Sequence, residues 1–170
     1  NTLMSLFTFQ RSNKEIQQIS ETSFGQEGIL ERQDIQEALK QNIEAITPDC
    51  LIVAEEYSEW DQSRKRIDLL GIDRDANLVI IELKRTDSGD HMELQALRYA
   101  SMISTMTFEH LIKVFTTYKN FNNFPDFTEE DAKDEIEEFI GKDLVEIEST
   151  FGDDVKIILV SADFSKELTT

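Results

Sequence analysis

The stretch from Arg66 to Arg85, RIDLLGIDRDANLVIIELKR, constrains the fold more than any other part of the chain. Two apolar runs on either side of a polar turn are typical of the two strands of a hairpin. Strands this apolar are usually buried on both faces of a sheet. Yet Asp68, Glu82 and Lys84 lie inside these runs, and a buried charge destabilises a core unless it has a partner. The fold must therefore supply partners for three charged side chains.

The rest of the chain alternates helical and strand patterns. Helical spacing of apolar residues is found in four places: 29–46, 91–104, 108–121 and 128–140. Strand patterns are found in six: 5–10, 15–20, 50–57, 66–72, 78–84 and 155–162. This order predicts an α/β fold in which helices flank a mixed central sheet. We assign residues 1–24 to an N-terminal strand pair and residues 25–170 to the main domain, with an acidic helical insertion at about 107–154.

The net charge of −18 argues, taken whole, against a nucleic-acid partner, because Lys and Arg drive binding to phosphates. The charge is unevenly distributed, however. Residues 61–120 hold nine acidic and nine basic side chains, whereas residues 121–170 hold fifteen acidic and four basic ones. The segment with the unusual hairpin is thus the least acidic third of the chain. We interpret the acidic segment 126–154 as a solvated face that keeps the protein soluble.

The three charged residues of the hairpin can meet on one face of a sheet. Residues two apart in a strand project from the same face, so Glu82 and Lys84 share a face, and the hairpin can bring Asp68 beside Glu82. Two adjacent carboxylates need a cation, which Lys84 or a divalent metal could provide. Two carboxylates, the Leu83 carbonyl and water form an oxygen site that suits Mg²⁺ or Mn²⁺. A metal and a lysine together suit the attack of water on a phosphodiester.

A buried salt bridge between Lys84 and either acid is the alternative interpretation, because the triplet Glu-x-Lys is common in proteins. The preceding Asp68, the apolar setting and the following helix favour the catalytic interpretation over the salt bridge.

The whole pattern resembles a known nuclease superfamily. Asp68, followed fourteen residues later by Glu82 in the triplet ELK on a hairpin flanked by helices, resembles the PD-(D/E)XK superfamily. The fuller pattern, RIDLLGID, LVIIELKR and ELQALRYA, is similar to the nuclease domain of NucS-like endonucleases and to related uncharacterised bacterial proteins. The resemblance covers roughly residues 28–106 and the strand at 155–161. It implies a restriction-endonuclease-like fold and cleavage of DNA with Mg²⁺ or Mn²⁺.

The resemblance also implies roles for particular residues. Asp68 and Glu82 would be metal ligands together with the Leu83 carbonyl, and Lys84 would be the catalytic lysine. Gln95, on the following helix, would contact the site or position water or phosphate.

An acidic residue near the first core helix often completes such sites. Glu31 is our choice, and Glu55 and Glu56 on the next strand are rivals that the sequence does not separate. The chain departs from the superfamily pattern at Ile67, which stands where many members have a proline.

Five residues are candidates for contacts with nucleic acid. Arg64, Arg66 and Arg85 cluster at the ends of the hairpin and could bind backbone phosphates. Arg98 and Tyr99 lie on the helix that carries Gln95. The basic cluster could equally be a solvated surface, and Tyr99 could equally pack in the core.

We therefore expect a Mg²⁺-dependent endonuclease that acts on DNA, with Asp68, Glu82, Lys84, Gln95 and Glu31 as catalytic residues. A homodimer or a separate targeting domain could add affinity. The single cysteine, Cys50, and the lack of a long apolar run or a secretory signal favour a cytoplasmic protein without a membrane partner.

Two other functions fit the sequence. The same fold could bind nucleic acid or a protein without cutting, and the net charge of −18 leaves this alternative open. An acidic interaction protein could instead dock a basic partner through residues 126–154. The nuclease and the first alternative differ in whether a divalent metal binds at Asp68 and Glu82. In the second alternative, Asp68 would have no part in the function.

Overall fold

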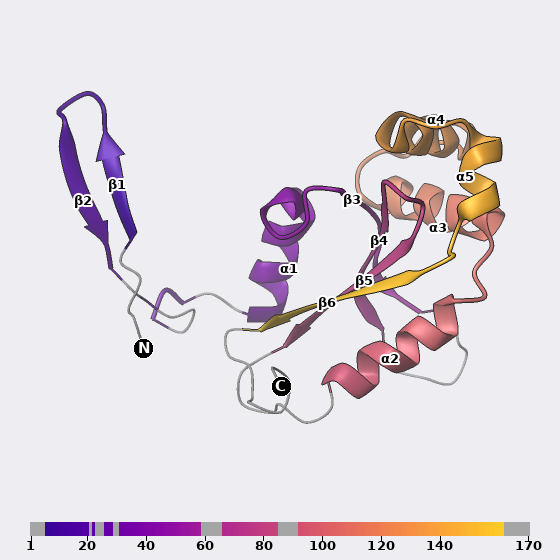
Figure 1. Cartoon of the computed structure of the whole chain (residues 1–170), viewed down its shortest axis with the longest axis horizontal. Helices are drawn as coiled ribbons and strands as arrows, with labels where there is room; N and C mark the ends of the chain where they lie inside the picture. Colours follow the sequence, from indigo (N-terminus) through magenta and orange to yellow (C-terminus); the bar gives the residue numbers. More distant parts are fainter. Residues whose placement is uncertain are drawn as a thin grey trace. The chain divides into compact units, whose positions relative to one another are not determined.

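The computed structural model describes these residues of the chain: 6–20, 22, 26–28, 31–58, 66–84 and 92–161. The chain divides into two units, Asn1–Leu30 and Glu31–Thr170 (Figure 1).

The N-terminal unit contains an antiparallel hairpin of β1 (Leu6–Gln10) and β2 (Glu15–Ile19). The register pairs Phe9 with Ile16 and Phe7 with Gln18. Because opposite residues share a face and residues two apart in a strand do too, Phe7, Phe9 and Ile16 lie on one face. All three side chains are exposed. The predicted strand pair is thereby confirmed.

A four-stranded mixed sheet forms the centre of the second unit. Its strands, in spatial order, are β3 (Cys50–Tyr57), β4 (Ile67–Asp73), β5 (Leu78–Lys84) and β6 (Val155–Ser161). The first three are antiparallel neighbours, and β6 runs parallel to β5. A parallel neighbour requires a long crossover, which here contains four helices. All seven residues of β4 are buried, as its apolar composition predicts.

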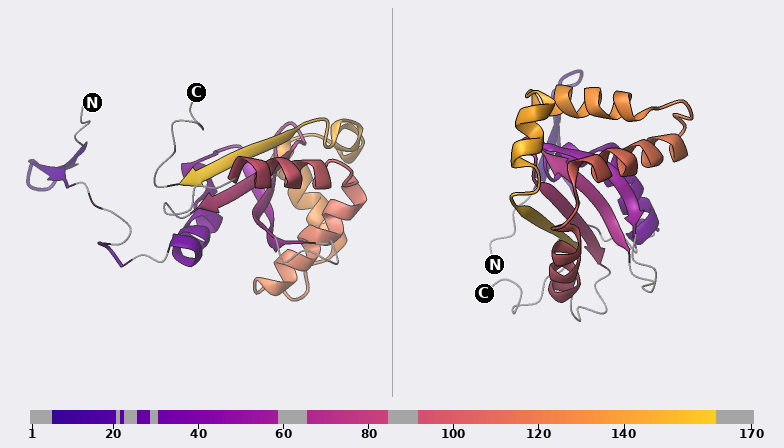
Figure 2. Two further views of the ribbon diagram at one scale, coloured as in Figure 1. Left: turned by 90° about the horizontal axis from the view of Figure 1, so that it is seen from below. Right: turned by 90° about the vertical axis from the view of Figure 1, so that its right-hand side faces the viewer.

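Helices cover both faces of this sheet. The described α-helices are α1 (Glu31–Gln41), α2 (Met92–Ile103), α3 (Phe108–Phe121), α4 (Glu129–Ile140) and α5 (Leu144–Thr150). Ile35 and Leu39 of α1 pack against the face that carries Leu69 and Ile81. Helices α2 and α3 pack on the opposite face, and α4 runs alongside α3 (Figure 2). The predicted mixed sheet with flanking helices is confirmed.

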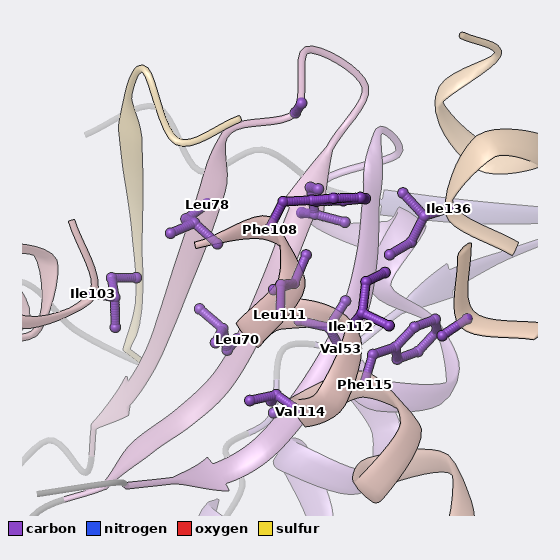
Figure 3. Close-up of a cluster of buried hydrophobic side chains, with 14 of the residues drawn as sticks. Val53, Leu70, Leu78, Ile103, Phe108, Leu111, Ile112, Val114, Phe115 and Ile136 are labelled. Atoms are coloured by element: carbon purple, nitrogen blue, oxygen red, sulfur yellow. The ribbon is translucent and has the colours of Figure 1, made fainter. Parts of the chain in front are cut away.

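The main core lies between the sheet and α3. Figure 3 shows Leu111 and Phe115 of α3 against Val53 and Leu70 of the sheet, and all four are fully buried. The segment 107–154 is helical, as predicted. It is more than a peripheral insertion, however, because α3 closes one face of the sheet and Ile136 of α4 joins the same cluster.

Local signals explain where the later helices begin and end. Thr107 caps α3, and Thr128 forms a capping box with Asp131 at the start of α4. Helix α4 ends at Gly141, whose φ of 77° is the left-handed conformation that glycine adopts most readily. Asp143 then accepts a hydrogen bond from the Glu146 amide and starts α5, a short helix that the sequence analysis missed.

The first helix is shorter than predicted. The apolar spacing extends from residue 29 to residue 46, but α1 ends at Gln41 and a 3₁₀ turn, Ile43–Ala45, follows it. The side-chain amide of Asn42 donates to the carbonyl of Ala38 at 2.9 Å. This bond takes over a carbonyl in the last turn and competes with continuation of the helix.

In the parts of the chain that the structure describes, no helix has the length and the apolar character that crossing a membrane requires.

Candidate active site

Asp68 and Glu82 are buried on neighbouring strands at one end of the sheet. The register of β4 and β5 pairs Leu69 with Ile81, and the next positions outward are Asp68 and Glu82. Opposite residues of antiparallel strands project from the same face, here the face that α2 and α3 cover. Each residue is 2% exposed. The two strands therefore hold two acidic side chains together in an otherwise aliphatic layer.

The Asp68 side chain links the two strands. Its Oδ2 accepts a hydrogen bond from the backbone N–H of Leu83 at 2.8 Å. Its main-chain carbonyl accepts a longer one, 3.4 Å, from Nε2 of Gln36 on α1. The hydrogen bond from Leu83 therefore holds the Asp68 side chain at the end of β5.

Gln95 connects helix α2 to the acidic pair. Its Nε2 donates to Oε1 of Glu82 at 2.6 Å and to the hydroxyl of Tyr99 at 2.9 Å. Gln95 and Tyr99 are four residues apart, so they share one face of the helix. The structure thus brings Gln95 to Glu82, whereas the sequence analysis proposed only that Gln95 contacts the site or positions water or phosphate.

Tyr99 takes part in this network from inside the core. Its side chain is 2% exposed and packs with Ile103 and the aliphatic residues of the sheet. This burial does not fit the predicted contact with nucleic acid, because a bound strand cannot reach the ring in this conformation. The alternative of core packing is the one that the structure supports.

Several predicted site residues are described only in part or not at all. Lys84 is the last residue of β5, where it pairs with Ser161, and Glu31 is the first residue of α1. The side chains of Lys84 and Glu31 lie outside the described part of the structure. Arg64 and Arg85 lie outside the described residues altogether.

The remaining predicted residues lie on the surface or in a separate cluster. Arg66 and Arg98 are exposed, as contacts with a phosphate backbone would require. Glu55, a rival for the completing acid, forms an ion pair of 2.9 Å with Lys40. Glu56, the other rival, has a φ of 47°, which is rare for a residue with a side chain.

The described donor set for a metal consists of Asp68 and Glu82. Among the residues that the structure describes, no group of three or more His, Cys, Asp and Glu side chains could hold a metal ion. The two buried carboxylates are hard oxygen donors, and the Leu83 carbonyl and water could complete an Mg²⁺ or Mn²⁺ site. The described carboxylates therefore fit a small hard cation.

The sequence analysis missed a polar cluster that joins α1, β3 and α3. Nζ of Lys40 lies 2.8 Å from Glu37, 2.9 Å from Glu55 and 3.2 Å from Oδ1 of Asn122. Burial alone would lower the pKa of Lys40, but the two carboxylates outweigh it and raise the pKa above its usual value. Burial raises the pKa of the nearby Tyr118 phenol to about 12.

Gln36 was missed as well, although it is 8% exposed and hydrogen-bonded to Asp68. Its one sequence signal is its position beside Ile35, next to the apolar stripe of α1. The contacts of Lys40 with Glu55 and Asn122 have no comparable signal, because these residues are 15 and 82 positions away from Lys40 along the chain.

Comparison of the chain with family models, with curated proteins and with solved structures finds no match.

Proposed function

We propose that the chain is a metal-dependent endonuclease that hydrolyses phosphodiester bonds of DNA, and that its α/β unit has a restriction-endonuclease-like fold. The observation that carries this proposal is the contact between Gln95 and Glu82 beside the buried Asp68. Strand β4 contributes Asp68 to the site, strand β5 contributes Glu82, and helix α2 contributes Gln95. The mixed sheet with helices on both faces also agrees with the proposed fold.

A structural role for this site would be an ion pair between Lys84 and either acid. Two carboxylates that are each 2% exposed lose the hydration that stabilises their charge, so a nearby cation is needed. A divalent metal ion would meet this need and would also serve the hydrolysis of a phosphodiester.

The ligands of such a cation would be Asp68, Glu82 and the carbonyl of Leu83. Mg²⁺ or Mn²⁺ held there would supply positive charge for the phosphate oxygens and would lower the pKa of the attacking water. Lys84, two residues after Glu82 on the same strand, holds or deprotonates the attacking water. The water oxygen bonds to phosphorus, one ester P–O bond breaks, and the leaving oxygen takes up a proton. Gln95 positions the Glu82 carboxylate through its 2.6 Å hydrogen bond.

A second candidate function is a module of the same fold that binds nucleic acid or a protein without cutting. The net charge of −18 favours a protein over a nucleic acid as the partner of this module, because so acidic a chain gains little general attraction to phosphates.

Metal binding and cleavage separate the two candidates. We would titrate Mg²⁺ and Mn²⁺ into the protein while following thermal unfolding, and would assay labelled single-stranded, duplex and branched DNA in parallel. A metal at about 100 times its Kd should stabilise the fold by about 2.7 kcal/mol. Asp68→Ala should lose both this stabilisation and the cleavage.

Asp153→Ala is the matched control, because it removes the same charge from an exposed turn before β6. Asp153→Ala should keep both the metal-induced stabilisation and the cleavage of DNA. If the intact protein shows no metal-induced stabilisation and cuts none of the three DNAs, the nuclease proposal is wrong and the binding module replaces it.

A further inference from the structure

The two edges of the four-stranded sheet differ in how they are protected from other strands. An exposed edge presents backbone N–H and C=O groups to which another strand can bind, and proteins usually block such an edge with charged residues or bulges. Strand β3, at one edge, has both: a register shift between Ile52 and Ala54, and the acidic residues Glu55 and Glu56. The β3 edge is therefore poorly suited to accept another strand.

Strand β6, at the other edge, lacks these protections. Its register with β5 is regular over all seven residues, and residues 157–160 form an uninterrupted aliphatic run (Figure 2). Its one charged residue, Lys156, forms an ion pair with Asp73 of β4 and so reaches across β5, away from the free edge. Among the described residues, no strand pairs with the outer side of β6. The β6 edge can therefore accept a further strand.

The aliphatic side chains of β6 are incompletely covered. The aliphatic residues of the inner strands β4 and β5 are at most 8% exposed, whereas Ile157, Ile158, Leu159 and Val160 are all partly exposed. Ile158 and Val160 pack on the α1 side of the sheet, and α2 contacts β6 from the other side. Because helices lie on both faces, the exposed part of these side chains is at the free edge, where a neighbouring strand would cover it.

The sequence of β6 is complementary to itself. Ile158 is the central residue of the strand, so antiparallel pairing of two copies with full overlap places the two Ile158 residues opposite one another. The same register pairs Ile157 with Leu159 and Lys156 with Val160. Aliphatic pairs thus fill the centre, and the two lysines do not face one another. Two-fold pairing of this kind is the commonest symmetry of soluble oligomers.

The charge of the chain favours this edge as the place where two copies meet. A net charge of −18 opposes association, so a contact between copies must avoid acidic side chains. Within the four-stranded sheet, β6 is the only strand without an Asp or Glu. The nearest acidic residues, Asp153 and Asp154, precede the strand, so antiparallel pairing puts those of the two copies at opposite ends.

We propose that the protein forms a two-fold symmetric dimer in which β6 pairs antiparallel with β6 of a second copy. The two four-stranded sheets then form one continuous sheet. About six backbone hydrogen bonds join the copies, because about half of the backbone groups of each strand point outward. The dimer does not depend on the proposed nuclease function and would remain if the chain did not cut DNA.

Sedimentation equilibrium of the full chain tests the dimer. At micromolar concentration the mass should approach twice the 19.6 kDa of one chain, more readily in high salt, which screens repulsion between the copies. Ile158→Lys puts two cations opposite one another and should weaken the dimer about 10-fold or more. Val145→Lys is the matched control, because Val145 is an aliphatic residue of α5 that is 79% exposed. It should leave the dimer unchanged.

A cysteine at the same position decides the question if the lysine variant does not fold. Opposite residues of antiparallel strands have Cβ atoms about 4.5–5.5 Å apart, close to the separation in a disulfide. Oxidation with diamide should therefore link Ile158→Cys chains in pairs. Thr117→Cys, at an exposed position of α3, should not link at the same concentration. The native Cys50 is buried, so it should not contribute.

Three outcomes would overturn the proposal. The first is a protein that keeps the mass of one chain throughout the micromolar range at both low and high salt. The second is a dimer that Ile158→Lys leaves intact and Phe9→Lys dissociates, because the exposed hairpin would then be the contact. The third is equal cross-linking of the Ile158→Cys and Thr117→Cys variants, which would indicate random collision.

Discussion

Gly71 of β4 lies against the side chain of Cys50 of β3. A Cβ atom added to Gly71 would overlap Sγ of Cys50 and lie 3.0 Å from the carbonyl oxygen of Leu51. Cys50 is 4% exposed, and burial, with the nearby charge of Asp73, raises the pKa of its thiol to about 12. The thiol therefore stays protonated and serves as a small buried hydrophobe, and lack of space is the reason for glycine at position 71.

Gly71→Ala should destabilise the fold by about 1–3 kcal/mol, because the added methyl group forces neighbouring atoms apart. Removing the sulfur should relieve this strain, so the double variant Gly71→Ala with Cys50→Ala should recover part of the loss. Urea unfolding followed by circular dichroism measures both values. Cys50→Ala alone is the control, and a double variant no more stable than Gly71→Ala would show that Sγ is not the obstacle.

At the scale of residues, the sequence drew attention to Asp68, Glu82 and Gln95 but not to the polar residues around them. Asp68 and Glu82 were found because charges inside apolar strands are conspicuous, and Gln95 because it follows at helical distance. The Lys40 to Asn122 hydrogen bond could not be predicted, because only the folded chain brings both side chains to Glu55 of β3. A polar residue on a partly exposed helix face, such as Lys40, is not conspicuous in the sequence in the way that a charge inside an apolar strand is.

At the scale of elements, the turn between β4 and β5 is fixed by one carboxylate. Oδ1 of Asp73 accepts from the backbone N–H groups of Asp75 and Asn77, each at 2.9 Å, and Oδ2 forms an ion pair with Lys156 of β6. Burial alone would raise the pKa of Asp73, but the Lys156 contact and these hydrogen bonds outweigh it and lower the pKa. The ionised form of Asp73 therefore holds three strands together at this end.

Asp73→Asn should lower the stability at neutral pH by about 1.5–3 kcal/mol, the usual value for hydrogen bonds to a charged group. The folded-state pKa is lower than the unfolded one, which is about 3.9. The ionised carboxylate therefore stabilises the fold above about pH 4, and this stabilisation disappears as the pH falls through the folded-state pKa. Unfolding in urea between neutral and acidic pH should show a gap between the two proteins that closes in acid.

Asp75→Asn is the control for this series, because Asp75 is exposed in the same turn and its backbone, not its side chain, bonds to Asp73. It should leave the stability nearly unchanged at every pH. A gap for Asp73→Asn that stays constant into acid would mean that the charge of Asp73 is unimportant.

The elements themselves were predicted where periodicity is long. The strands and the helices α2, α3 and α4 have apolar residues at regular spacing over several turns or a full strand. The structure contains these elements where that spacing predicts them. Helix α5 has seven residues and buries only Ile147 among those with a described environment, so periodicity cannot reveal it. Its signal is the N-cap Asp143, which the acidic surroundings obscure.

At the scale of the whole molecule, charge distribution is the dominant feature. The net charge of −18 is concentrated outside residues 61–120, which are neutral overall. Some acidic residues form ion pairs, such as Glu55 with Lys40 and Glu135 with Lys119, but most of the described Asp and Glu residues are exposed. Mutual repulsion of these carboxylates favours the expanded, unfolded chain. The interactions that stabilise the fold must therefore outweigh this electrostatic repulsion.

Salt should for this reason stabilise the protein at neutral pH. Raising NaCl from about 10 mM to about 100 mM shortens the screening length from about 30 Å to about 10 Å, which weakens repulsion between distant carboxylates most. The Tm should rise, by about 2–4 °C for each kcal/mol gained in a domain of this size. Near the sequence pI of 4.4, where the net charge vanishes, the same change in salt should have little effect. A Tm that falls with salt at neutral pH would show that the short ion pairs outweigh the net repulsion.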